Sequence, residues 1–561
     1  MWHKRTLGAF VALGLVLAAC GTGSPSESAT GSTAASTAES TAPTTPQVLT
    51  VPLGGEPASL DPNLASDSVS ITVLTQLVRP LVYFDPQLNT VSEGGLADSW
   101  DLSADGTEIT FHLKDGITYS NGDPIVAADF VYSWSRLIDP RTAADYSYVM
   151  LDVAGAADVY SADAGDDAAV EAALENFGVA APDDSTFVVT LDHPAAYFVS
   201  IATLWVGSPF TADMSFGEAS TYVSSGPYVM TDWSHGASIS LAPNPEWTAG
   251  PASKLTGIEF PIIEDPSQSL AAYENDEIDI VGVPSADVER IRTDDTLSQQ
   301  VVQGDRLSLE YYGFDMRDTS PFGQSKNLRH AFAEALDKQT LIDTIRNGIG
   351  TVAGSAVPPG MPGHIDASTL GIPYDPDQAK TDFAAGLTDL GLASAADLTL
   401  QLGYNAGGDH EATISYFQEQ WRTNLGVEVE PVSLEWSSYL TRLNEDPFSI
   451  FRLGWGADYP HPNNFLTDLF TCSSGNNNMQ YCNEQFDEYM RQAAVEPDLA
   501  KQVEIYNTAQ ELLVDDAPVI FISWGGRFTL VKPWVQGLQI TPQDFSSGAY
   551  FYTNVTIGDH A

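Results

Sequence analysis

The sequence predicts a mixed α/β protein with at least two lobes, and three patterns support this prediction. Residues 108–113 alternate between polar and apolar side chains, as a half-buried strand does. Residues 327–347 repeat apolar side chains mostly at helical spacing. Strand-like segments at 398–402 and 427–434 bracket a helical segment at 411–425, which is the order of a βαβ unit with parallel strands. Because about 510 residues follow the N-terminal region and single cores rarely grow past roughly 300 residues, two or more lobes are expected.

Turn and cap residues set the limits of the individual elements. The dipeptide Asn121-Gly122 marks a turn after the first strand. A helix is expected at 127–138, where Asp139-Pro140 stops it, and another strand at 187–191. Gly348 is suited to end the helix at 327–347.

Composition and charge exclude two classes of protein. The 23 Lys and Arg residues are outnumbered by 75 Asp and Glu residues, which gives a formal net charge of −52. That field repels polyanions, so no nucleic acid is expected as a partner. Aromatic residues make up 10% of the chain, which is too many for a protein that is disordered throughout.

The first residues have the pattern of an export signal. Lys4 and Arg5 precede an apolar run at 7–17, which is too short to span a bilayer comfortably. The run ends in LAAC at 17–20, and this string resembles a bacterial lipoprotein lipobox. The resemblance implies a signal peptide at 1–19, cleavage before Cys20 and lipidation of Cys20. The alternative is a plain secretory signal with an incidental cysteine.

A low-complexity segment follows the signal. Residues 20–47 consist almost entirely of Ser, Thr, Ala, Gly, Pro and Glu, so they are expected to form a disordered tether. No later segment reaches eighteen consecutive apolar residues, so the expected membrane contact is a lipid anchor.

The other two cysteines, Cys472 and Cys482, flank a segment rich in turn-forming residues. In an exported protein a disulfide between them is expected. A metal site is the alternative, but neither cysteine has a second Cys or a His at ligand spacing. We therefore predict no metal site.

Catalytic and cofactor motifs do not occur in complete form. The chain has no G-x-S-x-G, no S-x-x-K and no P-loop, and the glycines at 348–354 miss the dinucleotide fingerprint by one residue. His410-Glu411 begins like a zinc-protease motif but has no histidine four residues after His410. We therefore expect no catalytic residues, no cofactor and no enzymatic activity.

Residues 450–466 combine charges, aromatic rings and glycines in one short segment. The segment Gly454-Trp455-Gly456-Ala457-Asp458-Tyr459 follows an apolar run and precedes a proline-rich loop. Glycines allow another backbone to approach closely. Asp458 could face a ligand ammonium and Arg452 a ligand carboxylate. The alternative is structural, with the rings in the core, Asp458 capping a turn and Arg452 in an ion pair.

Many short segments along the chain resemble one family in the same order. They are 56–62 (EPASLDP), 95–100 (GLADSW), 110–116 (TFHLKDG), 120–125 (SNGDPI), 129–134 (DFVYSW), 225–228 (SGPY), 244–247 (NPEW), 328–332 (LRHAF), 455–459 (WGADY) and 531–535 (VKPWV). The chain is thereby similar to the family 5 extracellular solute-binding proteins of ABC importers, the oligopeptide- and dipeptide-binding group.

This resemblance implies a class II periplasmic-binding-protein fold, with two lobes and an extra inserted domain. Domain I is expected at 48–81, 207–306 and 526–561, domain II at 82–206 and domain III at 307–525. The ligand is expected between lobes that close by a hinge.

The resemblance also implies ligand-binding residues. Asp458 falls where the oligopeptide-binding branch holds the peptide's α-ammonium, and Gly454 and Gly456 would offer backbone groups to an extended peptide. Cations for the peptide carboxylate fall near Arg452, His410 and Arg346. The remaining expected contacts of the ligand are aromatic: Trp455, Trp436, Tyr146 and Tyr459. Two departures weaken the expectation for longer peptides: Gly456 replaces a cysteine of some members, and Leu443 replaces an arginine, with Arg442 one residue away.

The expected function is capture of short peptides for an ABC importer, by a monomeric lipoprotein on the outer face of the cytoplasmic membrane of a bacterium. Its partners would be the permease and ATPase subunits. Three alternatives remain: the same family with another cargo (nickel chelate, haem, opine, oligosaccharide or antibiotic precursor), a signalling or adhesion lipoprotein of the surface that senses peptides, and a hydrolase.

Overall fold

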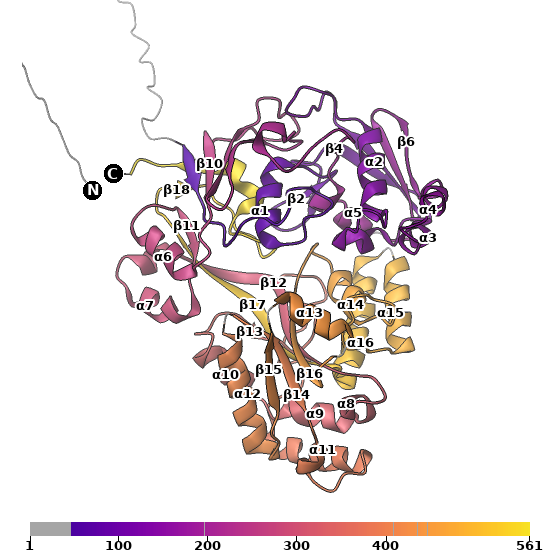
Figure 1. The fold of residues 1–561 in the computed structure, drawn as a ribbon, viewed down its shortest axis with the longest axis vertical. Helices are drawn as coiled ribbons and strands as arrows, with labels where there is room; N and C mark the ends of the chain where they lie inside the picture. The colour runs from indigo at the N-terminus through magenta and orange to yellow at the C-terminus, as the bar shows by residue number, and fades with distance from the viewer. Residues whose placement is uncertain are drawn as a thin grey trace, which may run out of the picture. The chain divides into compact units, whose positions relative to one another are not determined.

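Three larger β-sheets organise the chain in the computed structural model, which describes residues 47–560 apart from 196, 408, 435, 446 and 497 (Figure 1). The predicted signal peptide, Cys20 and all but the last residue of the predicted tether lie outside the described residues. None of the helices in the described part combines the length and apolarity needed to cross a bilayer.

The first sheet joins the start of the described chain to its middle, in the strand order β1-β10-β9-β8. Its strands are β1 (Val48–Thr50), β8 (Tyr228–Ser234), β9 (Ser238–Pro243) and β10 (Gly257–Pro261). The pairing of β1 with β10 is parallel, and the other pairs are antiparallel. Nearby elements are α1 (Ser68–Leu77), β2 (Tyr83–Phe84), β3 (Thr90–Val91), β18 (Val535–Gln536) and β19 (Thr556–Ile557). The helices α6 (Pro266–Glu274) and α7 (Val288–Thr293) belong to a separate small core, together with Val281 and Leu530.

The second sheet is antiparallel, in the order β4-β5-β7-β6. Its strands are β4 (Ala97–Leu102), β5 (Glu108–Leu113), β6 (Val179–Asp183) and β7 (Thr186–Thr190). The helices are α2 (Ala127–Ile138), α3 (Ala156–Tyr160), α4 (Asp167–Leu174) and α5 (Phe198–Ile201). One continuous core joins the first two sheets, with members from Leu49 to Ile557.

The third sheet has seven strands, in the order β11-β17-β12-β16-β14-β15, with β13 also on β17. The strands are β11 (Ile280–Gly282), β12 (Val301–Phe314), β13 (Thr351–Val352), β14 (Gln401–Asn405), β15 (Glu430–Leu434), β16 (Ile450–Gly456) and β17 (Val519–Val531). The predicted βαβ unit is present, since β14 and β15 pair in parallel and α12 connects them.

Hydrophobic cores lie on both faces of the third sheet, and alternating side chains along its strands contribute to each of them. Tyr311 belongs to one core and Tyr312 to the other. The first core includes residues of α13 (Trp436–Glu445), α14 (Asn463–Phe470), α15 (Glu484–Val495) and α16 (Leu499–Asp516). The second includes residues of α9 (Lys326–Glu334), α10 (Lys338–Thr344), α11 (Pro376–Asp389) and α12 (His410–Leu425), next to the short α8 (Pro321–Gln324).

The single helix expected at 327–347 is wrong in one respect, because the structure divides it into α9 and α10. Asp337 lies outside helical geometry and its side chain accepts a hydrogen bond from the Thr340 amide, so it caps a new helix. The apolar spacing continues across the break, and this is why periodicity alone does not reveal it.

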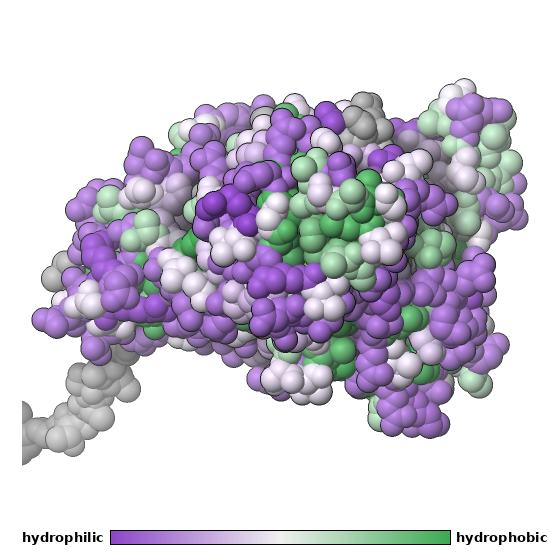
Figure 2. Space-filling model, turned by 90° about the horizontal axis from the view of Figure 1, so that it is seen from below, coloured by the Kyte–Doolittle hydropathy of each residue, from purple (hydrophilic) through white to green (hydrophobic). Residues whose placement is uncertain are grey.

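Two long strands, β12 and β17, run side by side through the middle of the molecule (Figure 1). They are antiparallel, with a register shift between Asp305 and Leu309. The expected domain boundaries at 306/307 and 525/526 fall inside these strands. The face seen in Figure 2 is largely hydrophilic, in keeping with the excess of acidic residues, and its most extended hydrophobic area lies near the centre of the view.

Candidate functional site

The site is organised around the end of β16, which carries the segment singled out in the sequence. β12 pairs antiparallel with the whole of β16, and β14 pairs with its first two residues, Ile450 and Phe451. Beyond Phe451, no strand within the described residues pairs with the second edge of β16. Gly454 and Gly456 are exposed there, and a Cβ built on Gly456 would meet nothing within 4 Å. The backbone of this segment is therefore open on one side.

Asp458 follows directly after β16 and is only 5% exposed. Its backbone amide donates to Asn464 Oδ1 at 2.8 Å, and Gln543 Nε2 donates to its carbonyl at 3.1 Å. These bonds fix the backbone of Asp458 at the end of the strand.

The Asp458 carboxylate accepts hydrogen bonds from three neutral groups. Tyr146 Oη donates to Oδ1 at 2.8 Å, Tyr148 Oη to Oδ2 at 3.0 Å and Asn464 Nδ2 to Oδ2 at 2.9 Å. Burial raises the pKa of Asp458, and these three hydrogen bonds partly offset the rise. No cation is among the groups that shift this pKa. The site is therefore a buried acid without a basic partner among the described residues.

Tyr146 and Tyr148 lie on a short 3₁₀ segment, Asp145–Met150, far from Asp458 in sequence. Their ring centroids are 5.7 Å apart, and Tyr146 makes an edge contact with Trp205 at 5.0 Å. Burial and the Asp458 charge hold the pKa of both tyrosines well above the usual value. Both hydroxyls therefore remain protonated at neutral pH and donate to the carboxylate.

Asn464, near the start of α14, connects several groups of the site. Its Oδ1 also accepts from Trp455 Nε1 at 3.2 Å, and its Nδ2 also donates to Asp468 Oδ2 at 2.9 Å. Trp455 is thereby oriented beside Asp458. Trp436 is the first residue of α13, and the structure does not describe its side chain.

Tyr459, another predicted contact, lies inside the protein at 1% exposure. Its Oη donates to Asp468 at 3.3 Å and accepts from Asn463 Nδ2 at 2.9 Å. Burial raises the pKa of Asp468 to about 7, and the nearby Asp458 and Asp152 carboxylates add to the rise. A cavity of about 480 Å³ adjoins this network, and its lining includes Asp152, Tyr197, Asn463 and Thr467.

The predicted carboxylate-binding arginines come together, and both bind Glu310 of β12. Arg346 Nη2 donates to Glu310 Oε2, and Arg452 Nε donates to Glu310 Oε1 at 3.3 Å. Burial works to raise the pKa of Glu310, but the two guanidinium groups hold it below the usual value. Arg346 Nε also lies 3.7 Å from Asp409 Oδ2. His410 begins α12, and its Nδ1 donates to the Asn405 carbonyl at 2.9 Å.

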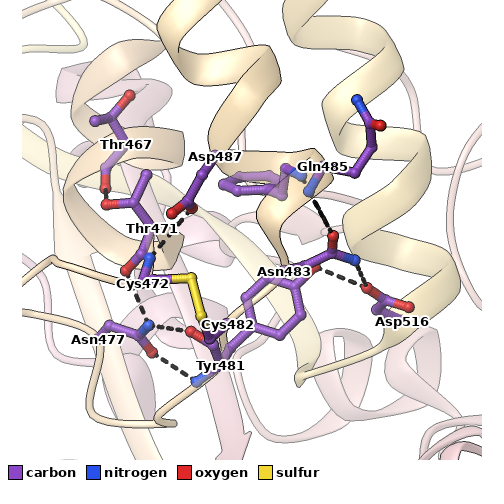
Figure 3. The surroundings of a disulfide bond; sticks show 11 residues. Thr467, Thr471, Cys472, Asn477, Tyr481, Cys482, Asn483, Gln485, Asp487 and Asp516 are labelled. Carbon is purple, nitrogen blue, oxygen red and sulfur yellow. Dashed lines mark hydrogen bonds between the residues drawn. A yellow bond between two sulfur atoms is a disulfide. The ribbon is translucent and has the colours of Figure 1, made fainter.

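Cys472 and Cys482 form a disulfide in the loop between α14 and α15 (Figure 3). Around it, the Cys472 amide donates to Asp487 Oδ1 at 3.2 Å, and Asn477 Nδ2 donates to the Thr471 carbonyl at 3.0 Å and to the Tyr481 carbonyl at 2.6 Å (Figure 3). The disulfide therefore ties the end of α14, the helix that carries Asn464, to the start of α15.

Known proteins are similar to this chain over most of its length. Residues 92–477 match the family model described as bacterial extracellular solute-binding proteins, family 5 middle. The chain belongs to this family. It is 31% identical over 537 residues to the oligopeptide-binding protein OppA of Bacillus subtilis (strain 168), with 93% of each chain covered. It is 26% identical over 503 residues to the dipeptide-binding protein DppE of the same organism, with 88% of this chain and 89% of that one covered.

A solved family member has the same fold. The structure of Haemophilus influenzae OppA in complex with RPPGFSPFR superposes with a TM-score of 0.75 at 25% identity, covering 92% of this chain and 99% of that one. The predicted class II periplasmic-binding-protein fold, with its two lobes of mixed helices and sheets, is thereby confirmed.

Sequence reasoning missed three residues of the site: Tyr148, Asn464 and Glu310. Tyr148 lies two residues after Tyr146, and Asn464 follows the proline-rich loop, so both had a weak local signal. Glu310 alternates with apolar residues in LSLEYY, a pattern that is typical of a solvent-facing strand position. Its two arginine partners come from distant parts of the chain, so this pairing had no local signal.

Proposed function

We propose that this chain is the extracellular substrate-binding lipoprotein of an ABC importer, which captures oligopeptides between its lobes and delivers them to the permease and ATPase subunits. The observation that supports this most is the Asp458 carboxylate, which is buried with no cation beside it in the part of the chain that the structure describes. An isolated buried charge is costly unless it is paired. The α-ammonium of a peptide is the missing partner, and a cargo without an amine would leave Asp458 unpaired.

The open edge of β16 suits the rest of a peptide. An extended chain that lies along Gly454 and Gly456 would exchange backbone hydrogen bonds with them, as an added strand does. Both positions are exposed glycines, so no side chain on the strand opposes this approach. Recognition through the backbone leaves the peptide's side chains free to vary, and hydrated pockets accommodate them.

Closure of the lobes brings the two halves of the site together. Tyr146 and Tyr148 belong to the proposed domain II (82–206), and Asp458 belongs to the proposed domain III (307–525). The proposed domain I (48–81, 207–306 and 526–561) is joined to domain III by β12 and β17, which form the hinge. In this mechanism, a bound ammonium and the two tyrosine hydroxyls surround one carboxylate when the lobes close.

The N-terminal region would attach this receptor to the membrane. Lipidation of Cys20 anchors the protein to the outer face of the cytoplasmic membrane, and residues 20–47 act as a flexible tether. The protein acts as a monomer, needs no cofactor or metal, and releases its cargo chemically intact.

Calorimetric titration with tetra-alanine and N-acetyl-tetra-alanine tests this function directly. The free-amine peptide is expected to bind at least about 100-fold more tightly, because only it supplies the cation, and 100-fold corresponds to roughly 2.7 kcal/mol. Mass spectrometry of the mixture is expected to recover the peptide unchanged. Equal affinity for both peptides, or cleavage of either, rules the proposal out.

A further inference from the structure

Glu310 holds the two arginines that the family resemblance assigns to the ligand's carboxylate. The three side chains are largely buried, with 12% of Arg346, 13% of Glu310 and 20% of Arg452 exposed. Each oxygen of Glu310 accepts from a different guanidinium group. We infer that Glu310 takes the place of a peptide's terminal carboxylate, so that this receptor binds peptides with a free N-terminus whether or not their C-terminus is free. This inference depends on the proposed peptide-binding function.

The charges of the cluster balance within it. Arg346 and Arg452 contribute two positive charges, and Glu310 and Asp409 contribute two negative charges within 4 Å of them. A second carboxylate that enters here meets about as much repulsion as attraction. A terminal carboxylate therefore gains little from a cluster that is already neutral.

Other polar groups occupy further donors of the two arginines. Arg346 Nη1 donates to Ser523 Oγ, and Arg452 Nη1 donates to Asn405 Oδ1 at 3.3 Å. The nearby His410 is also fixed, since a carbonyl oxygen only accepts and Nδ1 must therefore carry the proton. Groups of the protein therefore orient both cations.

The backbone keeps Glu310 in this place. β12 is the central strand between β16 and β17, and Glu310 is paired with Gly454 on one side and Ser523 on the other. Since Gly454 lies on the open edge of β16, the cluster is beside the proposed path of the peptide. From Arg452 to Asp458 an extended chain spans at most about 20 Å, which is the length of roughly six residues. In a series of peptides of three to six residues that start at Asp458, the C-terminus therefore reaches successive points along this interval, up to Arg452.

The first test needs no variant. Oligoalanines of three, four, five and six residues are titrated as free acids and as C-terminal amides at about 0.15 M salt, where exposed charges beyond roughly 8 Å are screened. At every length, the two forms are expected to bind within about threefold of each other, a difference of roughly 0.7 kcal/mol. A preference of more than about tenfold for the acid at any length overturns the inference.

The second test frees the arginines. In Glu310→Gln, the acid form is expected to bind at least about tenfold more tightly than the amide at one or more lengths, because Arg452 then lacks its carboxylate partner and the cluster, with Asp409 as its remaining acid, carries one net positive charge. The matched control is Glu428→Gln, which removes the same charge from an exposed position between α12 and β15 and should leave the ratio unchanged. A Glu310→Gln protein that folds, as checked by thermal unfolding, and still does not distinguish acid from amide overturns the role of Glu310.

The outcomes distinguish a failure of the proposed peptide-binding function from a failure of the inference about Glu310. Failure of all free-amine peptides to bind the native protein refutes the peptide-binding function. Binding with a strong preference for the free acid refutes only the inference about Glu310. If Glu310→Gln does not fold, the series of acids and amides on the native protein decides alone.

Discussion

Replacing Asp458 by Asn tests the centre of the site with the smallest change of shape. An ammonium nitrogen about 3 Å from the carboxylate gains roughly 5 kcal/mol at an effective dielectric constant near 20. The ligand must share this carboxylate with Tyr146 and Tyr148, and the loss of a hydrogen bond to a charged group offsets roughly 1.5–3 kcal/mol. The net loss of binding free energy in Asp458→Asn is therefore about 3 kcal/mol, or roughly two decades in Kd.

Calorimetry of the native protein and of Asp458→Asn, each with tetra-alanine and its N-acetyl form, measures the coupling free energy between Asp458 and the peptide's α-ammonium. N-acetylation should weaken binding to the native protein about 100-fold and should have little further effect on Asp458→Asn, because the interaction is already absent. The control is Asp515→Asn, since that carboxylate is 65% exposed and pairs with Lys326 on the surface. If the effects of Asp458→Asn and N-acetylation are additive, the ammonium does not lie on Asp458.

The buried Asp458 carboxylate also predicts that peptide affinity depends on pH. Burial raises the pKa of Asp458, and an ammonium binds only the ionised form. Affinity should therefore be full above this pKa and should weaken as pH falls through it, by at most tenfold per pH unit. Titrations of the native protein between pH 4 and 8 should show this decline, and Asp458→Asn should not.

Three further predictions follow from single features. In Gly456→Ala, the added methyl group meets no protein atom within 4 Å, so the free energy of unfolding should change by less than about 0.5 kcal/mol. The affinity for tetra-alanine should fall roughly tenfold or more, because the methyl group crowds a peptide that lies against this strand. Unchanged calorimetric affinity would place the peptide elsewhere. The pKa of Asp468 is about 7 in the folded protein, against an ordinary value of 3.8. The folded state therefore binds the Asp468 proton more tightly than the unfolded state does, and the free energy of unfolding falls as pH rises from about 4 to 7. Urea unfolding should show that the free energy of unfolding of Asp468→Asn falls by about 3 kcal/mol less between pH 5 and 8 than that of the native protein. An equal fall in both proteins contradicts the raised pKa of Asp468. Replacing Cys472 and Cys482 by Ser opens a loop with a sequence separation of 10 and should lower the unfolding free energy by up to about 3 kcal/mol, whereas an unchanged urea midpoint would show that the bond contributes nothing.

Local elements were predictable where the stop signals are local. The helix expected at 127–138 is α2 with the same limits, because the Asp129 side chain accepts from the Val126 amide at its start and Pro140 follows its end. The strand expected at 398–402 begins three residues later, at Gln401, and the Leu398 amide donates back to the Ala395 carbonyl of the 3₁₀ turn at 395–397. Such shifts depend on hydrogen bonds that periodicity does not record.

The site was predictable only in part. The resemblance predicted Asp458 and Tyr146 as ligand contacts, and the structure places their side chains in contact although 312 positions separate them. It also predicted Arg346 and Arg452 as ligand contacts but gave no sign of Glu310, since this pairing depends on the register of β12 against β16. Contacts of this kind arise from the packing of distant segments, which residue spacing does not encode.

The two central strands have a consequence for the evolution of the molecule. Residues 315–518 leave from the end of β12 and return at the start of β17, where the Phe314 amide donates to the Pro518 carbonyl at 3.0 Å. The two ends of this segment are therefore neighbours, as the ends of a tolerated insertion are. The segment carries Asp458 and most of the arginine cluster, so exchanging it between relatives as one cassette would transplant much of the binding surface while both junctions stay in the same ladder.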